Sequence, residues 1–352
     1  MKIVCLNRFA TPITGGEKYN ERFFSFLSHY ANEEIESTPT DFEIEYPSWK
    51  KFIAPILELK LLRLLRGDKL IFFFDSSYKY HLLLSLFLWL FNRQAKTVVI
   101  VHHFPFLGDK GLRRIINFCW QYLYMLPCRA MLVPSPYTYD VALRIFPRKK
   151  IFFVPIPFQK QYSSSEIYEK GNWLYVGTIE ERKGLHYLIE ALHYIKDLKP
   201  DCQFVLNIVG KVANEDYYRR LTQQIANMGL SEHVKFRGRV TDEELSECYN
   251  RAEIFTFPSL LEGYGMVIVE ALSRGVPVVA FNNSAMPYSI KDGVNGLLAE
   301  NGNAHSFAEK ILALTGNSIL RAELQKGMEK TMMHVKTEDD FQQAIVELYS
   351  HV

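Results

Sequence analysis

The sequence predicts an α/β protein made of two doubly wound domains, each a parallel sheet with helices on both faces. Three observations predict this class. Short apolar runs alternate with helical stretches along the chain, a pattern typical of parallel sheets. The alternation occurs twice, before and after a proline-containing and then polar joint at Phe152–Lys170. The length of 352 residues also exceeds what a single hydrophobic core usually supports.

The first series of elements starts with a strand at Lys2–Leu6, followed by a helix that opens at Gly15 and Gly16. Buried strands are then expected at Leu70–Phe74, Thr97–Val101 and Ala130–Val133, where apolar runs lead into polar or turn residues. The second series has strands at Trp173–Val176, Phe204–Val209, Val234–Phe236, Ile254–Phe257 and Val276–Phe281, separated by helices such as Leu185–Ile195, Tyr217–Met228 and Asp242–Asn250. The segment Asp339–Tyr349 is an amphipathic helix.

These elements predict a Rossmann-like domain over residues 1–158 and a second one over 159–335. We expect the C-terminal helix at 336–352 to pack back on the first domain. In open α/β sheets, ligands bind outside the carboxyl ends of the strands. With two such sheets facing each other, we expect the active site in a cleft between the domains.

Cysteine and hydropathy patterns predict a cytoplasmic protein. The five cysteines are scattered and form no CxxC spacing, which favours a reducing compartment and no structural zinc. The N-terminus runs straight into a strand, which is not typical of a signal peptide. The strongly apolar run Leu82–Phe91 is too short to cross a bilayer.

The charge is unevenly distributed along the chain. Residues 46–160 contain 18 basic and 5 acidic side chains, which suggests a polyanionic partner. Nucleic acid is not expected, because no nucleic-acid-reading motif is present. An anionic membrane surface, contacted through residues 46–129, fits better. Lys50–Arg66 places cations beside a leucine-rich stripe, and Gly111–Tyr124 is a basic, aromatic helix. The alternative is that these are ordinary core-facing helices with a solvated face.

Two glutamates eight residues apart are the most informative pair. Glu262 and Glu270 flank a turn with Gly263 and Gly265, and a short helix is expected at Met266–Arg274. The start of such a helix points backbone N–H groups at a phosphate or sugar oxygen. Glu270 lies in an apolar segment, where a charge needs a partner that a sugar hydroxyl could provide. The alternative is that both glutamates are solvated surface charges.

A cationic loop follows the strand that ends at Gly177. Arg182 and Lys183 lie on this loop, directly before Gly184. Arginine offers a bidentate fork and lysine a point charge for phosphate oxygens. The pair could neutralise a diphosphate without metal, and no Asp-x-Asp motif is present. Alone, the segment could equally be an exposed cationic turn.

In combination, these motifs resemble those of retaining GT-B glycosyltransferases, above all the large family numbered four. The resemblance covers nearly the whole chain and is strongest over 171–300. It implies two Rossmann-like domains facing across a cleft, the first binding the acceptor and the second the nucleotide sugar. The implied reaction moves a sugar from a nucleotide-diphosphate sugar, UDP- or GDP-linked, to an acceptor hydroxyl with retention of configuration. No cofactor or metal is expected. The implied acceptor is a glycan or lipid-linked molecule of cell-envelope polysaccharide, lipopolysaccharide or glycolipid synthesis, at the inner face of the plasma membrane.

The resemblance also implies roles for individual residues. Glu270 would bind the ribose and Glu262 the donor sugar, while Arg182 and Lys183 would stabilise the leaving nucleoside diphosphate. His102, directly after the strand Thr97–Val101, would serve as the active-site histidine. His103 stays an alternative, as does a pair of core histidines. The other implied donor-binding residues are Gly15, Gly16, Gly177, Arg239, Val240, Gly263, Tyr264, Gly265, Met266 and Val267.

Three segments differ from the family pattern. Thr178 stands where an arginine is usual, Asn283–Tyr288 replaces a Gly-Gly…Pro-Glu segment, and Pro155–Pro157 replaces an Asn-Gly. Two alternative functions therefore stay open. One is another nucleotide-sugar reaction on this fold, an epimerase or a sucrose-type synthase. The other is a non-catalytic partner subunit, which Thr178 favours and which the two glutamates and His102 oppose.

Overall fold

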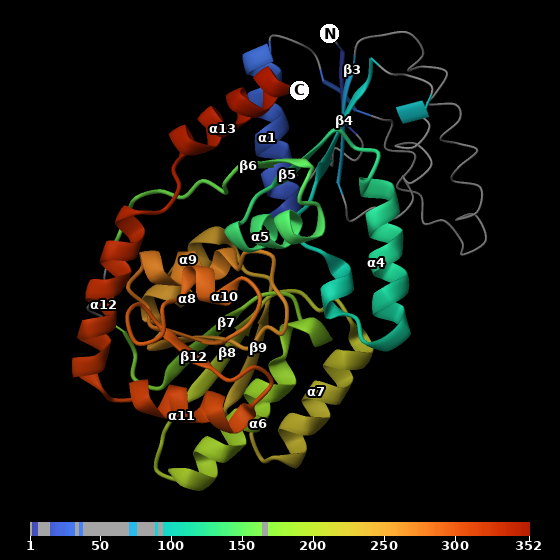
Figure 1. Cartoon of the computed structure of the whole chain (residues 1–352). Helices are drawn as coiled ribbons and strands as arrows, with labels where there is room; N and C mark the ends of the chain where they lie inside the picture. The colour runs from blue at the N-terminus through green and yellow to red at the C-terminus, as the bar shows by residue number, and fades with distance from the viewer. Residues whose placement is uncertain are drawn as a thin grey trace. The chain divides into compact units, whose positions relative to one another are not determined.

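The chain forms two compact units, seen in a computed structural model (Figure 1). Unit 1 comprises Met1–Phe158 and Lys336–Val352, and unit 2 comprises Gln159–Val335. The structure describes residues 2–5, 15–31, 35–37, 70–75, 89–90, 94–163 and 168–352. Each unit has a six-stranded sheet, and every strand pair in both is parallel. The predicted α/β class with two parallel sheets is confirmed. None of the described helices is long and apolar enough to cross a membrane.

The sheet of unit 1 has the order β2-β1-β3-β4-β5-β6. Its strands are β1 (Lys2–Cys5), β2 (Ile35–Ser37), β3 (Leu70–Asp75), β4 (Lys96–Ile100), β5 (Ala130–Val133) and β6 (Lys150–Phe153). Its helices are α1 (Gly15–Ala31), the 3-10 turn η3 (Pro105–Gly108), α4 (Gly111–Met125), α5 (Pro136–Ile145) and α13 (Glu338–His351). The strand order changes direction between β1 and β3, which is where ligands bind in doubly wound sheets.

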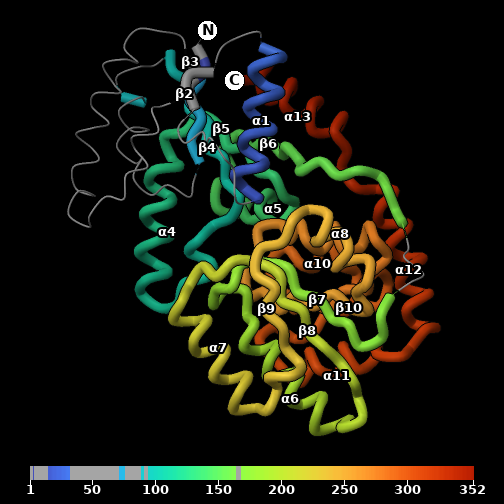
Figure 2. The backbone as a smooth tube through the Cα atoms, turned by 180° about the vertical axis from the view of Figure 1, so that it is seen from behind, coloured from blue at the N-terminus to red at the C-terminus, as the bar shows by residue number. Residues whose placement is uncertain are grey.

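Helix α13 packs on α1, so the C-terminal segment belongs to unit 1 (Figure 2). The Tyr19 and Phe341 rings meet edge to face with centroids 5.8 Å apart. Arg22 and Glu338 form an ion pair at the same contact. The backbone N–H of Phe158 donates to the carbonyl of Lys336 over 2.7 Å. The two chain segments of unit 1 are thereby joined where unit 2 leaves and returns.

The sheet of unit 2 has the order β12-β11-β10-β7-β8-β9. Its strands are β7 (Asn172–Val176), β8 (Val205–Val209), β9 (Val234–Gly238), β10 (Ile254–Phe257), β11 (Val278–Phe281) and β12 (Leu297–Ala299). Its helices are α6 (Leu185–Leu198), α7 (Glu215–Asn227), α8 (Asp242–Arg251), α9 (Met266–Ser273), α10 (Met286–Ser289), α11 (Ala304–Leu314) and α12 (Ser318–Met333), with the 3-10 turn η4 (Glu181–Lys183). Helices α6, α7 and α11 cover one face and α8 and α9 the other (Figure 1). The change of direction lies between β7 and β10.

Some expected elements differ from the structure. Phe152 and Phe153, expected in the joint, belong to β6, a half-buried strand at the edge of the sheet that begins with charged Lys150. The strand expected at Val276–Phe281 begins at Val278. The leucine-rich segment Lys50–Arg66 lies outside the described residues.

Candidate active site

The candidate site of unit 2 lies at the change of direction of its sheet. Strands β7 and β10 are paired neighbours, so the loops at their carboxyl ends leave the same edge. The first loop carries Arg182 and Lys183, and the second carries Glu262. The backbone N–H of Leu260 donates to the carbonyl of Arg182 over 2.9 Å. This bond joins the two loops. The sequence pattern alone does not show that they are in contact.

One carboxylate oxygen of Glu262 gathers three donors. Oε1 lies 2.5 Å from Lys183 Nζ and 3.3 Å from Arg182 Nη1. It also accepts a hydrogen bond from Ser259 Oγ over 2.7 Å. Glu262 is only 9% exposed, so this carboxylate is a buried charge that two cations compensate.

The titration of Glu262 reflects that pairing. Burial on its own would raise the pKa of this carboxyl, but Lys183, Arg182 and the hydrogen bonds from Lys183 and Ser259 outweigh burial and hold the pKa below its ordinary value. The lowered pKa favours the ionised carboxylate, whose two oxygens act only as hydrogen-bond acceptors.

The two cations differ in how they are held. Arg182 divides its guanidinium among three acceptors: Glu180 Oε1 at 2.7 Å, the Leu261 carbonyl at 2.7 Å and Glu262. Lys183 has Glu262 as its ion-pair partner and lies 5.2 Å from the centre of the Phe257 ring. Lys183 is thus the cation that relies most on Glu262 as its counter-ion.

Backbone geometry fixes this cluster in place. Gly184 follows the cations with φ 68°, and a Cβ there would lie 2.1 Å from the Pro258 carbonyl oxygen. Ser284, a non-glycine residue with φ 41°, accepts the backbone N–H of Glu262 on its Oγ over 2.9 Å. Ser284 lies in the segment where the family pattern has two glycines. Its hydroxyl therefore supplies a contact that glycine could not.

Glu270 lies in α9, and its described hydrogen bonds are with residues outside the cation cluster. Its Oε2 accepts a hydrogen bond from the Tyr249 hydroxyl over 3.0 Å. Burial, and next the neighbouring Glu270 carboxylate, raise the pKa of Tyr249 well above its ordinary value, so the phenol stays a donor. Arg274 lies over the Tyr249 ring, 5.0 Å from its centre. The expected need of Glu270 for a partner is thus met in part within the protein.

The other expected donor-binding residues lie in two places. Gly263, Tyr264, Gly265, Met266 and Val267 form the end of the loop after β10 and the first turn of α9. Gly265 caps that helix with φ 82°, a conformation that favours glycine. Gly177 follows β7, whereas Arg239 and Val240 follow β9 at the sheet edge. No hydrogen bond described here joins Arg239 or Val240 to the Glu262 cluster.

Unit 1 brings a second polar cluster to the change of direction of its own sheet. His102 Nε2 lies 3.0 Å from Asn20 Oδ1 and 3.2 Å from Asp75 Oδ2. Asn20 Nδ2 donates to Asp75 Oδ2 over 2.8 Å. Since both oxygens facing Nε2 are acceptors, Nε2 carries a proton in this arrangement. Asn20 and Asp75 are both buried, which makes them a rigid support for the imidazole.

The surroundings of this cluster separate the two candidate histidines. A Cβ at Gly16 would lie 3.3 Å from His102 Cδ2, so Gly16 allows α1 to approach the ring. The Tyr19 ring meets His102 edge to face at 5.5 Å. None of these contacts involves His103. Gly15 begins α1 and is exposed.

Comparison with known proteins assigns unit 2 to a family. Residues 159–331 match the family described as Glycosyl transferases group 1. Unit 2 is a group 1 glycosyltransferase domain. An uncharacterized glycosyltransferase of Methanocaldococcus jannaschii is 34% identical over 161 residues, which cover 45% of this chain and 43% of that protein. The phosphatidyl-myo-inositol mannosyltransferase of Mycobacterium leprae is 33% identical over 150 residues, which cover 42% and 38%. The matches therefore span less than half of these relatives' own length.

Solved structures show the same fold over the whole chain. Sucrose-phosphate synthase of Thermosynechococcus elongatus has a TM-score of 0.80 at 16% identity and covers 100% of this chain and 99% of its own. HepE of Anabaena, solved with UDP and glucose, has a TM-score of 0.74 at 19% identity and covers 100% of both chains. At these identities the likeness concerns the fold alone, and it confirms the expected GT-B fold.

Several residues of the two polar clusters were not predicted from the sequence. Asp75 directly follows the predicted strand Leu70–Phe74, just as His102 directly follows the next predicted strand. A search for polar residues directly after buried strands would therefore also have selected Asp75. Asn20 lies four residues after Gly16 and so on the same side of α1. Ser259 is a loop serine without a distinguishing pattern. Ser284 could not be found, because a positive φ at serine has no sequence signature.

Proposed function

We propose that this chain is a glycosyltransferase that moves a sugar from a nucleotide-diphosphate sugar to an acceptor hydroxyl, with retention of configuration and without metal. The observation that carries the proposal is the cluster of Lys183, Arg182 and Glu262 at the change of direction of the unit 2 sheet. This cluster lies inside the segment that matches the group 1 glycosyltransferases. It offers cations for a diphosphate and a carboxylate for sugar hydroxyls within one set of contacts.

In the proposed reaction, the acceptor oxygen bonds to the anomeric carbon on the face that the donor phosphate leaves. The bond between that carbon and the phosphate oxygen breaks, and the acceptor proton passes to the departing phosphate. Lys183 and Arg182 stabilise the negative charge that develops there. Glu262 orients the sugar through its hydroxyls, and His102, held by Asn20 and Asp75, is the proposed catalytic histidine of unit 1.

The remaining donor contacts are assigned by their place along the chain. We assign the ribose to Glu270, sugar or phosphate oxygens to the backbone N–H groups of Met266 and Val267, and the base to Arg239 and Val240. A UDP-sugar is the first donor to test, since HepE was solved with UDP and glucose. A lipid-linked or polysaccharide acceptor is supported by relatives such as the O-antigen chain mannosyltransferase B of Escherichia coli, 33% identical over 144 residues.

A thermal-shift panel of nucleotide sugars tests this proposal. A ligand at one hundred times its Kd stabilises the folded state by about 2.7 kcal/mol, so a bound donor raises the melting temperature measurably. We expect UDP- or GDP-sugars to shift the wild type. Glu270→Ala should weaken binding about tenfold or more, since a hydrogen bond to a charged group contributes about 1.5–3 kcal/mol.

Tyr249→Phe is the matched control for that variant. It removes the protein partner of Glu270 and keeps the carboxylate, so nucleotide binding should persist. If no nucleotide or nucleotide sugar shifts the wild type, the proposed function is wrong. If Glu270→Ala responds like the wild type, the ribose assignment is wrong.

We also propose peripheral binding to an anionic membrane through α4. This helix has an outward stripe of apolar side chains at helical spacing: Leu112 (71% exposed), Ile115 (60%), Ile116 (58%), Trp120 (43%) and Leu123 (54%). Arg113 and Arg114 lie in the same helix, and its first turn has no acidic residue. Apolar side chains beside cations fit the interface of an anionic bilayer.

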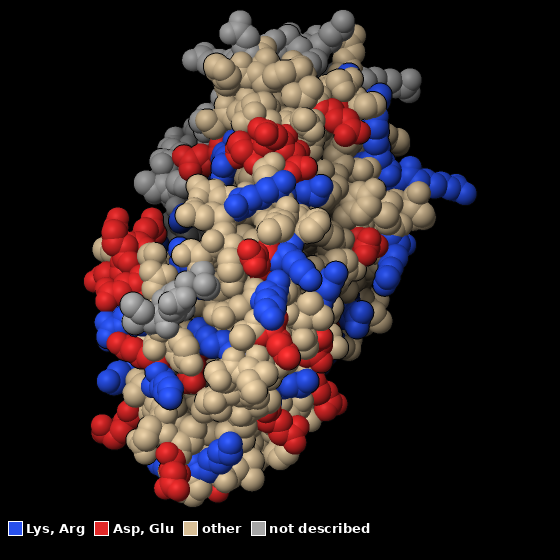
Figure 3. Space-filling model, turned by 90° about the vertical axis from the view of Figure 1, so that its left-hand side faces the viewer, with Lys and Arg blue, Asp and Glu red and all other residues tan. Residues whose placement is uncertain are grey.

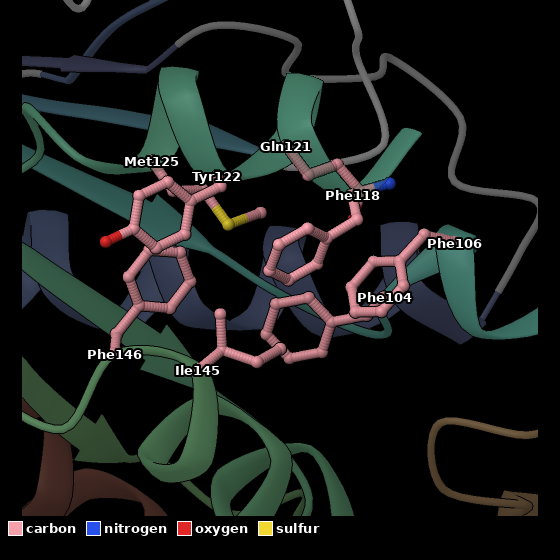
Figure 4. A pocket seen from close by; sticks show the side chains of 8 residues that line it. All are labelled: Phe104, Phe106, Phe118, Gln121, Tyr122, Met125, Ile145 and Phe146. Carbon is pink, nitrogen blue, oxygen red and sulfur yellow. The ribbon is translucent and has the colours of Figure 1, made fainter. Parts of the chain in front are cut away.

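The opposite side of α4 is already occupied by the core of unit 1. Phe118, Tyr122 and Met125 line a small apolar pocket together with Gln121, Phe104, Phe106, Ile145 and Phe146 (Figure 4). Lys149 Nζ donates to the Met125 and Leu126 carbonyls at the end of the helix. The outward stripe is thus additional to the side chains that hold α4 in place. On the face of the molecule shown in Figure 3, basic and acidic side chains are interspersed, so that face is a poorer match to an anionic surface.

Liposome flotation tests the membrane proposal. Wild type should float with vesicles containing phosphatidylglycerol and less with neutral vesicles. Replacing Ile115 and Ile116 together by Glu removes two apolar groups and adds two negative charges, so binding should fall at least about tenfold.

The control is Ile319→Glu, which changes a side chain that is 74% exposed on α12 of unit 2. It should float like the wild type. Equal recovery of the wild type on anionic and neutral vesicles, or without vesicles, would contradict an anionic-membrane surface.

A further inference from the structure

The cations assigned to the donor diphosphate already have an anion. Lys183 Nζ and Arg182 Nη1 both contact Oε1 of Glu262, the residue assigned to the donor sugar. Only 12% of the Lys183 side chain and 11% of the Glu262 side chain are exposed. The carboxylate assigned to the sugar and the cations assigned to the diphosphate are therefore paired with each other in this structure.

A diphosphate cannot simply be added to this arrangement. Its oxygens are negative, and beside a buried carboxylate they would be repelled strongly, because little water screens the charges. The Glu262 carboxylate must therefore release the ammonium of Lys183 at least in part when a diphosphate binds there. A carboxylate that loses a cation in a buried site needs new donors.

The backbone of Glu262 is held separately from its carboxylate. Its N–H donates to Ser284 Oγ, and Ser284 Oγ donates to Asn283 Oδ1 over 2.7 Å. Asn283 Nδ2 in turn donates to the Ser259 carbonyl over 2.9 Å. With the main chain fixed in this way, release from Lys183 requires only a rotation of the side chain, during which Ser259 can keep one hydrogen bond.

We propose that Glu262 is an exchangeable internal anion that couples sugar recognition to diphosphate binding. The inference rests on the proposed function and adds an order of events to it. The donor diphosphate takes over Lys183, and the released carboxylate accepts hydrogen bonds from the sugar hydroxyls. A nucleoside diphosphate without sugar displaces the carboxylate and offers it no new donors. Glu262 therefore makes the site favour a nucleotide sugar over the bare nucleotide that remains after transfer.

Calorimetric titration of UDP and UDP-glucose, with GDP and GDP-mannose as the second pair, tests this coupling. In Glu262→Gln the neutral amide no longer competes for Lys183. We expect bare UDP or GDP to bind this variant about tenfold more tightly than wild type. The nucleotide sugar should gain less, so the preference for sugar over bare nucleotide should fall.

The Lys183 backbone N–H donates to the Glu180 carbonyl over 3.0 Å, which any side chain at this position keeps, and the Glu180 carboxylate contacts Arg182 but forms no described ion pair with Lys183. Glu180→Gln is therefore the matched control. It should change the affinities for the bare nucleotide and the nucleotide sugar by similar factors. Glu262→Asp keeps the charge but shortens the reach to Lys183, so its preference should lie between wild type and Glu262→Gln. This second variant keeps the test valid if Glu262→Gln does not fold.

The outcomes separate the inference from the function beneath it. If the bare nucleotide binds wild type and the Glu262 variants equally, or more weakly to the variants, Glu262 is not a competing anion and the inference alone is wrong. If no nucleotide binds the wild type or any variant, the proposed function and the inference are both wrong.

Discussion

Gly184→Ala is expected to lower the free energy of unfolding of unit 2 by about 3 kcal/mol. A non-glycine residue in this left-handed conformation costs about 1–2 kcal/mol, and the added Cβ would lie 2.1 Å from the Pro258 carbonyl oxygen. That oxygen is backbone, so the clash can be relieved only by moving the loop that carries Glu262, and such overpacking costs typically about 1–3 kcal/mol more. Calorimetry should show the melting temperature of unit 2 falling by about 6–12 °C.

Gly229→Ala separates the two causes. Gly229 has φ 63°, and a Cβ there would meet only the end of the Lys196 side chain at 3.9 Å. This control should therefore show the conformational cost alone. Nucleotide binding should also weaken in Gly184→Ala and stay unchanged in Gly229→Ala, since Gly184 directly follows Lys183. Equal melting temperatures for the two variants would contradict the close approach of these loops.

His102→Ala should lower turnover at least about a hundredfold while nucleotide affinity stays near that of wild type. The magnitude is that of removing one positioned polar group from an active site. Affinity should persist because the donor nucleotide is assigned to unit 2, whereas His102 lies in unit 1. Turnover is measured as nucleoside diphosphate released from the donor that gives the largest thermal shift.

His103→Ala and Asp75→Asn complete that experiment. His102 is the ring that lies against Gly16, Asn20 and Asp75, so removal of its neighbour His103 should change turnover little. Asp75→Asn keeps the size of the side chain and weakens the support of the imidazole, so it should lie between wild type and His102→Ala. A larger loss in His103→Ala than in His102→Ala would reverse the assignment.

The fold class could be predicted because its signal repeats along the chain. Each buried parallel strand is a short apolar run, and runs such as Leu70–Phe74 and Ile254–Phe257 coincide with observed strands to within one residue. Strand β6 was missed because its short apolar run leads directly into Pro155 and Pro157, which placed Phe152 and Phe153 in the joint. The helix α13 was predicted from its periodicity, and its capping box at Thr337 and Asp340 gives it a defined start.

The candidate site was predicted less completely than the fold. The sequence gives the type of each residue and the strand that its loop follows, which was enough to select Glu262, Lys183 and His102 as candidates. It does not give contacts between loops, so the ion pairing of Glu262 and the support of His102 by Asp75 came from the structure. Their roles in donor and acceptor binding stay predictions until the variants are measured.

The return of α13 to unit 1 bears on the order in which the protein folds during synthesis. Unit 2 is one uninterrupted stretch of chain, whereas unit 1 needs α13 against Tyr19 and the Phe158–Lys336 hydrogen bond to be complete. Domains usually fold in the order in which they leave the ribosome. Here the second unit can reach its native structure first, while the first stays incomplete until α13 has been made. One face of α1 therefore stays uncovered while unit 2 is being synthesised, and that interval is when a chaperone would have the most to bind.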